Sequence, residues 1–250
     1  MFLVKNVWKK EFNMLKNRVK IGDLFITSIV CLFISIFMYI FALVSVLSSQ
    51  ENDIKKIISK YINNVLIVEV NTVGGEIIKG SAIIINPYNV ISVAHLFSFP
   101  VESIIAYSYN KQSSFNLTLI DCNESKDLAL LSTDVKVGDY KNLKMISKTE
   151  VFYGDKIVKI GNALGQGISI DSGIVSNPFQ KIEFEDNVFD VIQVSINIRS
   201  GDSGGAIFNT KGEFLGIISF KTNNGLNSSD SLSYIIPSFV ISVYLDSVNQ

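Results

Sequence analysis

Hydrophobic residues are spread unevenly along the chain, and their longest run lies near the N-terminus. Residues 24–47 contain no charged residue. The hydrocarbon core of a bilayer is crossed by roughly 20 apolar residues in a helix, so this run is long enough to span with some tilt. A cleaved signal peptide usually has an apolar run of about 7–15 residues that ends in a small-x-small site. This run is longer, and no A-x-A stands near its end. We therefore predict a retained transmembrane helix at residues 24–47.

The charged residues around the apolar run predict its orientation in a membrane. Six lysine or arginine residues and two acidic residues precede residue 24. Because positively charged flanks stay in the cytoplasm, we expect a basic cytoplasmic segment at residues 1–23 and an extracytoplasmic location for the rest of the chain. An apolar stripe at helical spacing predicts a linker with a short helix over residues 48–63. We expect a single-pass protein of a bacterial cell membrane, in which the lipid bilayer is the partner of residues 24–47.

From residue 64 onward, short runs rich in β-branched residues alternate with Gly, Asn, Asp, Ser and Pro. Strands are expected at residues 65–70, 76–85, 90–93, 103–109, 115–119, 128–131, 156–160, 168–175, 188–194, 206–209, 214–220 and 232–236. Many short strands at close intervals, without long helices between them, are typical of an all-β sandwich or barrel. Helical spacing returns after Pro237, which predicts a closing helix at residues 237–249.

Composition and charge exclude several classes of protein. Hydrophobic residues make up 48% of the 250 residues, which excludes a disordered chain. The net charge of −1 excludes a generally basic nucleic-acid binder, so no nucleic-acid partner is expected. Two cysteines cannot form a four-cysteine zinc site, and the single histidine excludes sites built from two. We expect no metal and no cofactor, and the oligomeric state stays open.

The sharpest chemical signal is the segment Gly201-Asp202-Ser203-Gly204-Gly205. Glycines on both sides of a serine let the backbone adopt strained turns and approach a ligand closely. Such a turn can supply a nucleophile together with backbone N–H groups that face a developing oxyanion. An ordinary surface turn is the alternative. The segment also fits the G-x-S-x-G elbow of α/β-hydrolases, but those enzymes need a histidine after the serine and this chain has none there.

Two further motifs carry a histidine and a carboxylate. His95 ends the apolar run that begins at Val90, and Asp127 opens the apolar run that continues to Leu131. A histidine can take the proton of a serine hydroxyl near neutral pH, and a carboxylate can orient its ring. Taken alone, each motif also fits a structural residue: a satisfied core histidine, or a turn residue that leads into a strand.

Together the three motifs resemble a known family. The order His95, Asp127, Ser203 resembles chymotrypsin-fold serine proteases, and the local sequences are similar to the HtrA (DegP-type) branch. The matching segments are Gly80-Ser81-Ala82-Ile83-Ile84, Val93-Ala94-His95, Asp121 with Asp127-Leu128-Ala129-Leu130-Leu131, residues 154–165, Ser172-Gly173-Ile174-Val175-Ser176 and Ile236-Pro237. The resemblance covers roughly residues 60–248.

This resemblance implies a fold and an activity. The fold is all-β, a chymotrypsin-like pair of six-stranded barrels at about 64–147 and 150–236 with a C-terminal helix, and the protease domain covers residues 64–250. The activity is that of a serine endopeptidase that cuts extracytoplasmic proteins through an acyl-enzyme. In it, Ser203 is the nucleophile, His95 the general base and acid, and Asp127 the orienting carboxylate. The N–H groups of Gly201 and Ser203 form the oxyanion hole.

The chain also departs from this family. HtrA proteins usually carry a C-terminal PDZ domain, and we expect none here because the sequence ends at Gln250. Ala206 stands where proline is frequent. Asp202 replaces the usual HtrA asparagine, as in digestive trypsins, where that aspartate pairs with a freshly cut N-terminus. We do not expect such zymogen activation, because the N-terminus is predicted to lie across the membrane.

The resemblance places the primary substrate pocket between two short segments. Its expected substrate-binding residues are Asn197, Ile198, Arg199, Ser219, Phe220 and Lys221. No acid stands at the expected pocket base, which disfavours selection of Lys or Arg. Ile198 favours a small or medium apolar residue, whereas Arg199 and Lys221 either favour an acidic residue or point to solvent.

Two alternatives to a constitutively active protease stay open: a protease latent until a partner orders its loops, and a catalytically silent fold that serves as a partner-binding module.

Overall fold

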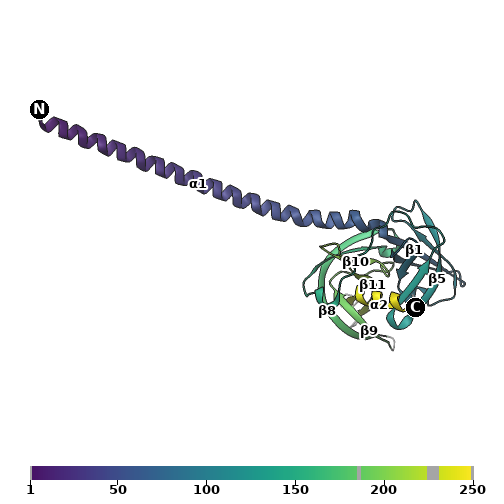
Figure 1. Ribbon diagram of the computed structural model, residues 1–250. Coiled ribbons are helices and arrows are strands. Elements are labelled where there is room, and N and C mark those ends of the chain that lie inside the picture. Colours follow the sequence, from purple (N-terminus) through teal and green to yellow (C-terminus); the bar gives the residue numbers. More distant parts are fainter. Residues whose placement is uncertain (1, 185–186, 224–230, 249–250) are drawn as a thin grey trace. The chain divides into compact units, whose positions relative to one another are not determined.

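The computed structural model describes residues 2–184, 187–223 and 231–248. The chain divides into two compact units, Met1–Asn52 and Asp53–Gln250, which are described separately. Helix α1 (Phe2–Tyr61) begins in the first unit (Figure 1). Its last turns, from Asp53 onward, belong to the second unit. The structure thus has one unbroken helix from Phe2 through the range 24–47 and most of the range 48–63.

The first unit carries the apolar run. Phe25–Val44 has a mean hydropathy of 2.5 and is, within the described residues, the one segment long and apolar enough to cross a membrane. All its side chains are exposed. The Ser28 and Ser35 hydroxyls donate to the carbonyls of Phe25 and Cys31, about one turn back. The polar groups of these serines are therefore satisfied inside the helix, as an apolar surrounding requires.

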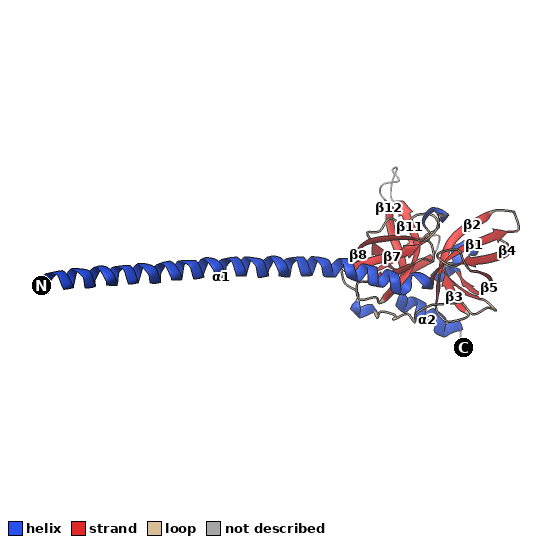
Figure 2. Ribbon diagram, turned by 90° about the horizontal axis from the view of Figure 1, so that it is seen from above, coloured by secondary structure: helices blue, strands red, loops and turns tan. Residues whose placement is uncertain are grey.

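The second unit contains two closed barrels of six antiparallel strands each within the described residues. The first barrel has the order β1-β2-β3-β6-β5-β4 and the second the order β10-β11-β12-β9-β8-β7. The strands are β1 (Val65–Thr72), β2 (Ile77–Ile84), β3 (Asn89–Ser92), β4 (Val101–Tyr107), β5 (Ser114–Asn123), β6 (Leu128–Ser132), β7 (Lys156–Gly161), β8 (Ser169–Phe184), β9 (Asn187–Val194), β10 (Ala206–Asn209), β11 (Phe214–Asn223) and β12 (Ser231–Pro237). Figure 2 shows β1 to β5 on one side of this unit and β7, β8, β11 and β12 on the other. The expected all-β, chymotrypsin-like fold is confirmed.

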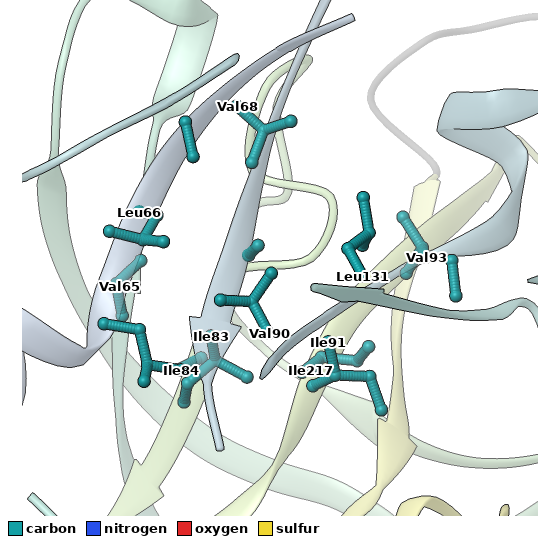
Figure 3. Packing of buried hydrophobic residues seen from close by; sticks show 14 of the residues in the cluster. Val65, Leu66, Val68, Ile83, Ile84, Val90, Ile91, Val93, Leu131 and Ile217 are labelled. Atoms are coloured by element: carbon teal, nitrogen blue, oxygen red, sulfur yellow. The ribbon is translucent and has the colours of Figure 1, made fainter. Parts of the chain in front are cut away.

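One apolar cluster joins the two barrels. Val65, Ile83 and Ile91 of the first barrel and Ile217 of the second belong to it and are buried (Figure 3). Helix α2 (Ser238–Val248) closes the chain and buries Ile241 and Tyr244 in the same cluster. The two barrels are thereby held against each other, so residues on neighbouring loops of the two barrels can share one site.

The end of α1 is anchored in the second unit. Tyr61 is 1% exposed and stacks on Phe208 of β10, with ring centroids 4.4 Å apart and an interplanar angle of 11°. Ile57, one turn earlier, is also buried. The apolar stripe that predicted a helix in this region is thus the face that packs on the barrels.

Strand β8 is longer than the run at residues 168–175 predicts. It continues to Phe184, with irregular pairing to β9 between Val175 and Gln180. Pro178 lies in this irregular part, where a missing N–H is tolerated. The proline and its polar neighbours hide the second half of the strand from a pattern of alternating hydrophobicity. Residue 249, the last of the predicted closing helix, lies outside the described residues.

Candidate active site

His95 and Asp127 come from neighbouring loops of the first barrel. His95 lies in a single helical turn, Ala94–Phe97, directly after β3. Asp127 follows the turn Glu124–Lys126 and has left-handed backbone angles (φ 51°, ψ 45°), which aspartate tolerates better than most residues. Strand β6 pairs with β3, so both side chains lie at the same end of the barrel.

The two side chains are hydrogen-bonded. His95 Nδ1 lies 3.0 Å from both carboxylate oxygens of Asp127, and the backbone N–H of His95 donates to Oδ1 at 3.0 Å. The Asp127 side chain is 8% exposed and that of His95 is 43% exposed. A buried carboxylate that receives Nδ1–H leaves Nε2 as the proton acceptor on the exposed edge of the ring.

Ser219 of β11 connects the carboxylate to the second barrel. Its hydroxyl donates to Asp127 Oδ2, and its carbonyl accepts the Ser203 hydroxyl at 3.2 Å. Sequence reasoning put Ser219 around the substrate pocket and did not foresee the contact with Asp127. Ser219 is 1% exposed. In this structure it is therefore a buried hydrogen-bond donor to the Asp127 carboxylate.

Ser203 lies just before β10, the strand that begins at Ala206 in the second barrel. Its hydroxyl is half-buried and bonded to the Ser219 carbonyl. Within the described residues, no hydrogen bond joins His95 and Ser203. In sites without substrate, such bonds are often long and tighten only when substrate binds.

A tight turn at residues 199–202 precedes Ser203. Asp202 N–H donates to the Arg199 carbonyl at 3.0 Å, and Gly201 has a φ of +88°, as the third residue of such a turn requires. Leu164 N–H donates to the Ser200 carbonyl at 2.6 Å. Because the C=O and N–H of a trans peptide point in opposite directions, the Gly201 N–H faces away from the Leu164 loop. In the described part of the chain, the N–H groups of Gly201 and Ser203 donate to no acceptor.

Strand β2 holds this turn from the first barrel. Ser81 N–H donates to the Ser203 carbonyl at 2.8 Å, and the Ser81 hydroxyl donates to the Gly201 carbonyl at 2.9 Å. A Cβ at Gly204 would lie 1.9 Å from the Ser81 carbonyl oxygen, so only glycine fits there. Sequence reasoning used Ser81 only as part of a family motif and missed these contacts. The Gly80-Ser81 pair inside an apolar strand is the signal that could have found them.

A cleft of about 530 Å³ lies beside the histidine. It is lined by Ala94, His95, Ser98, Glu124, Asp127, Asn187, Phe189 and Phe220. Both barrels contribute, and the lining combines two carboxylates with two phenylalanines. Of the six residues expected to bind substrate, Phe220 lines this cleft.

The other residues expected to bind substrate lie differently. Ile198 is buried in the core of the second barrel. Asn197, Arg199 and Lys221 are exposed. Arg199 contributes its backbone, whose N–H donates to Asp202 Oδ2 at 2.9 Å. The exposure of both basic side chains favours the alternative in which they point to solvent.

A second potential nucleophile, Cys122, lies close to this site. Its Sγ is 4.0 Å from the Ala94 carbonyl oxygen. Burial, and then the charges of Glu124, Asp121 and Asp127, raise the pKa of the Cys122 thiol. A raised pKa keeps the thiol protonated and poorly nucleophilic. Across residues 2–184, 187–223 and 231–248, no group of three or more His, Cys, Asp or Glu side chains could hold a metal ion.

Comparison with known proteins identifies the family of the chain. A family model described as a trypsin-like peptidase domain matches residues 80–217. The chain therefore belongs to the trypsin-like peptidase family. It is 35% identical over 133 residues to a probable periplasmic serine endoprotease DegP-like of Hahella chejuensis, covering 53% of this chain and 27% of the relative. It is 27% identical over 168 residues to the serine endoprotease DegS of Salmonella typhimurium, covering 63% of this chain and 44% of the relative.

A solved structure has the same fold. The HtrA-type protease AlgW, solved with a tripeptide, matches with a TM-score of 0.69 at 22% identity, over 78% of this chain and 63% of that one. These relatives confirm the resemblance to HtrA-type serine proteases. The chain spans less than half the length of the two curated relatives.

Proposed function

We propose that the chain is a membrane-tethered serine endopeptidase that hydrolyses peptide bonds of proteins outside the cytoplasm. The observation that carries the proposal is the line of contacts from His95 through Asp127 and Ser219 to Ser203. In the proposal, these contacts link a base and an orienting carboxylate of the first barrel to a nucleophile of the second. The trypsin-like peptidase family acts on proteins or peptides, which supports the substrate class.

The reaction follows from these groups. Ser203 turns from the Ser219 carbonyl toward His95, and its oxygen attacks the scissile carbonyl carbon while Nε2 takes its proton. The negative oxygen that forms is stabilised by the N–H groups of Gly201 and Ser203. His95 then gives the proton to the leaving amine, the C–N bond breaks, and an acyl-enzyme remains. Water then gives a proton to His95 and attacks the acyl carbon. The bond between Ser203 Oγ and the acyl carbon breaks, and His95 returns the proton to Ser203 Oγ as the carboxylic acid leaves.

The membrane part of the proposal rests on α1. Phe25–Val44 presents apolar side chains on every side, which suits lipid as the surrounding medium. The basic residues that precede it favour a cytoplasmic N-terminus. A tether of this kind would hold the protease domain at the outer face of the membrane.

A latent protease is the second candidate, and the resting position of Ser203 favours it. The hydroxyl is bonded to the Ser219 carbonyl and not to His95. If substrate or a partner is needed to turn the hydroxyl, activity rises with occupancy of the cleft. The free N–H groups of Gly201 and Ser203 argue against a latency that disorders the oxyanion hole.

Hydrolysis of an unfolded protein tests the proposal. The full chain in detergent micelles is incubated with chemically unfolded casein, and fragments are followed by mass spectrometry. Wild type and a Ser247→Ala control, whose hydroxyl bonds the Tyr244 carbonyl within α2, should produce the same fragments. Ser203→Ala should produce none. Equal cleavage by Ser203→Ala would refute the assignment of the nucleophile, and a cleavage rate that rises with pre-incubation of a cleft-binding peptide would favour the latent form.

A further inference from the structure

An ion pair lies in the core beside the oxyanion turn. Lys159 Nζ is 2.7 Å from Asp202 Oδ2, and the side chains are 1% and 0% exposed. In each of the other ion pairs in the described ranges, at least one side chain is more than 40% exposed. The buried pair therefore has no counterpart in this part of the molecule.

Stability of the core does not explain this pair. Lys159 lies on β7 two residues after Ile157, on the same face of the strand and inside the second barrel. Removing two charges from water costs free energy that their attraction often fails to repay, and well-packed apolar residues are often as stable. We therefore look for the role of Lys159 in the backbone geometry that its partner Asp202 holds.

Asp202 joins the two ends of the turn through its carboxylate and its backbone. Its Oδ2 accepts the Arg199 N–H at 2.9 Å, while its backbone N–H donates to the Arg199 carbonyl at 3.0 Å. Gly201 lies between these two residues, and Ser203 follows. Asp202 is fully buried, and a buried charge is costly unless an opposite charge pairs with it.

Lys159 provides that compensation. Asp202 Oδ1 is buried and has no hydrogen-bond partner in the described part of the chain. A Cβ at Gly161 would approach it to 2.8 Å, so the β7 backbone lies close against it. Lys159 is thus the cation that pairs with the buried Asp202 side chain.

We propose that Lys159 is a positioning residue of the hydrolytic site. Through Asp202 it fixes the turn 199–202 in the form that presents the N–H groups of Gly201 and Ser203. The inference rests on the proposed function, because it assigns these N–H groups to the oxyanion. Both partners of the pair belong to the uncut chain, so the turn forms on folding and needs no proteolytic cut.

The test uses full-length chain in detergent micelles and a fluorophosphonate probe. The labelling rate is measured at several probe concentrations. Its dependence on probe concentration separates the binding constant KI from kinact, the rate constant of the chemical step. Lys159→Met keeps the length of the side chain and removes the charge. Asp202→Asn keeps an oxygen for the Arg199 N–H and removes the charge that needs compensation. Lys144→Met is the matched control, because Lys144 pairs with Glu213 between β10 and β11.

Lys159→Met should lower kinact by about 100-fold or more, as loss of an oxyanion donor does, with KI changed by less than about threefold. Adding Asp202→Asn should restore kinact to within about tenfold of wild type, because no buried charge is left unpaired. Lys144→Met should leave kinact unchanged. A Lys159→Met variant with wild-type kinact, or a double variant no faster than Lys159→Met, would overturn the proposal.

Two further comparisons keep the proposal falsifiable. If Lys159→Met fails to fold, kinact is compared between Asp202→Asn and the double variant, which should agree within about threefold because no carboxylate remains to be held. A larger difference overturns the proposal. If wild type does not react, the proposed function fails by itself. Hydrogen exchange over residues 196–206 then decides: Lys159→Met should exchange faster there than wild type, and equal exchange refutes the positioning.

Discussion

Asp127→Asn is the most informative single substitution, because the carboxylate receives hydrogen bonds from three donors. These are the backbone N–H of His95, the ring Nδ1 of His95 and the hydroxyl of Ser219. The backbone donor is fixed at Oδ1, so an asparagine should place its oxygen there. Its NH₂ group then takes the position of Oδ2, which lies 3.0 Å from Nδ1.

The consequence is a change of tautomer in the histidine. An NH₂ group that faces Nδ1 donates to it, so the ring proton moves to Nε2 and the ring can no longer take the proton of Ser203. A wrong tautomer of this kind lowers the rate of the chemical step by about 10⁴-fold. That factor corresponds to about 5.5 kcal/mol of activation free energy. Folding stability should fall by less than about 2 kcal/mol, because the shape is kept and the Ser219 hydroxyl can turn to accept.

The assay combines the rate constant of fluorophosphonate labelling with thermal melting of the full chain in micelles. Asp121→Asn is the matched control, since Asp121 accepts the Tyr244 hydroxyl at 2.6 Å and, within the described residues, makes no hydrogen bond to His95. The control should label as fast as wild type. A folded Asp127→Asn variant that labels within about tenfold of wild type would refute the reasoning, because the carboxylate would then not control the histidine.

Three further predictions concern stability. Gly204→Ala should lower the free energy of unfolding by about 2–5 kcal/mol in urea titration, because φ is +83° and the new Cβ would lie 1.9 Å from a backbone oxygen. In the control Gly138→Ala, the new Cβ would have no atom within 4 Å, so the free energy of unfolding should not fall in this way. Tyr61→Ala should cost about 3–5 kcal/mol in the same titration, because it empties a buried aromatic site. Hydrogen bonds from Lys144 and, to a lesser extent, from Asn209 lower the pKa of Glu213 in the folded chain. The Glu213 carboxylate therefore adds to the free energy of unfolding above its unfolded pKa, and this contribution is lost as pH falls through its folded pKa. Melting temperatures should therefore fall less in Glu213→Gln than in wild type on acidification below about pH 4.3.

Much of the fold follows from local pattern. Short β-branched runs between turn residues placed the strands, and the glycines around Ser203 marked the strained turn. Each of these patterns lies within a few consecutive residues, so it can be recognised without knowing which segments meet in the fold. Strand β8 exceeded its prediction because Pro178 and polar neighbours interrupt the alternation while pairing continues past them.

Contacts between distant segments were not predictable in this way. Ser81 bonds the turn around Ser203 from the other barrel, and Ser219 supports Asp127 from β11. A sequence pattern says which face a residue occupies but not which loop lies opposite. Lys159, a lysine between Val158 and Ile160, resembles an ordinary solvent-facing strand position. Its burial became visible only with the pairing of β7 and β10.

The central claim is that Ser203 is an activated nucleophile, and one measurement tests it most directly. Full-length chain in micelles is treated with a fluorophosphonate, digested, and mapped by tandem mass spectrometry. The account predicts one modified residue, Ser203, with labelling lost in His95→Ala. Labelling at another residue, or labelling of Ser203 that persists unchanged in His95→Ala, would contradict it.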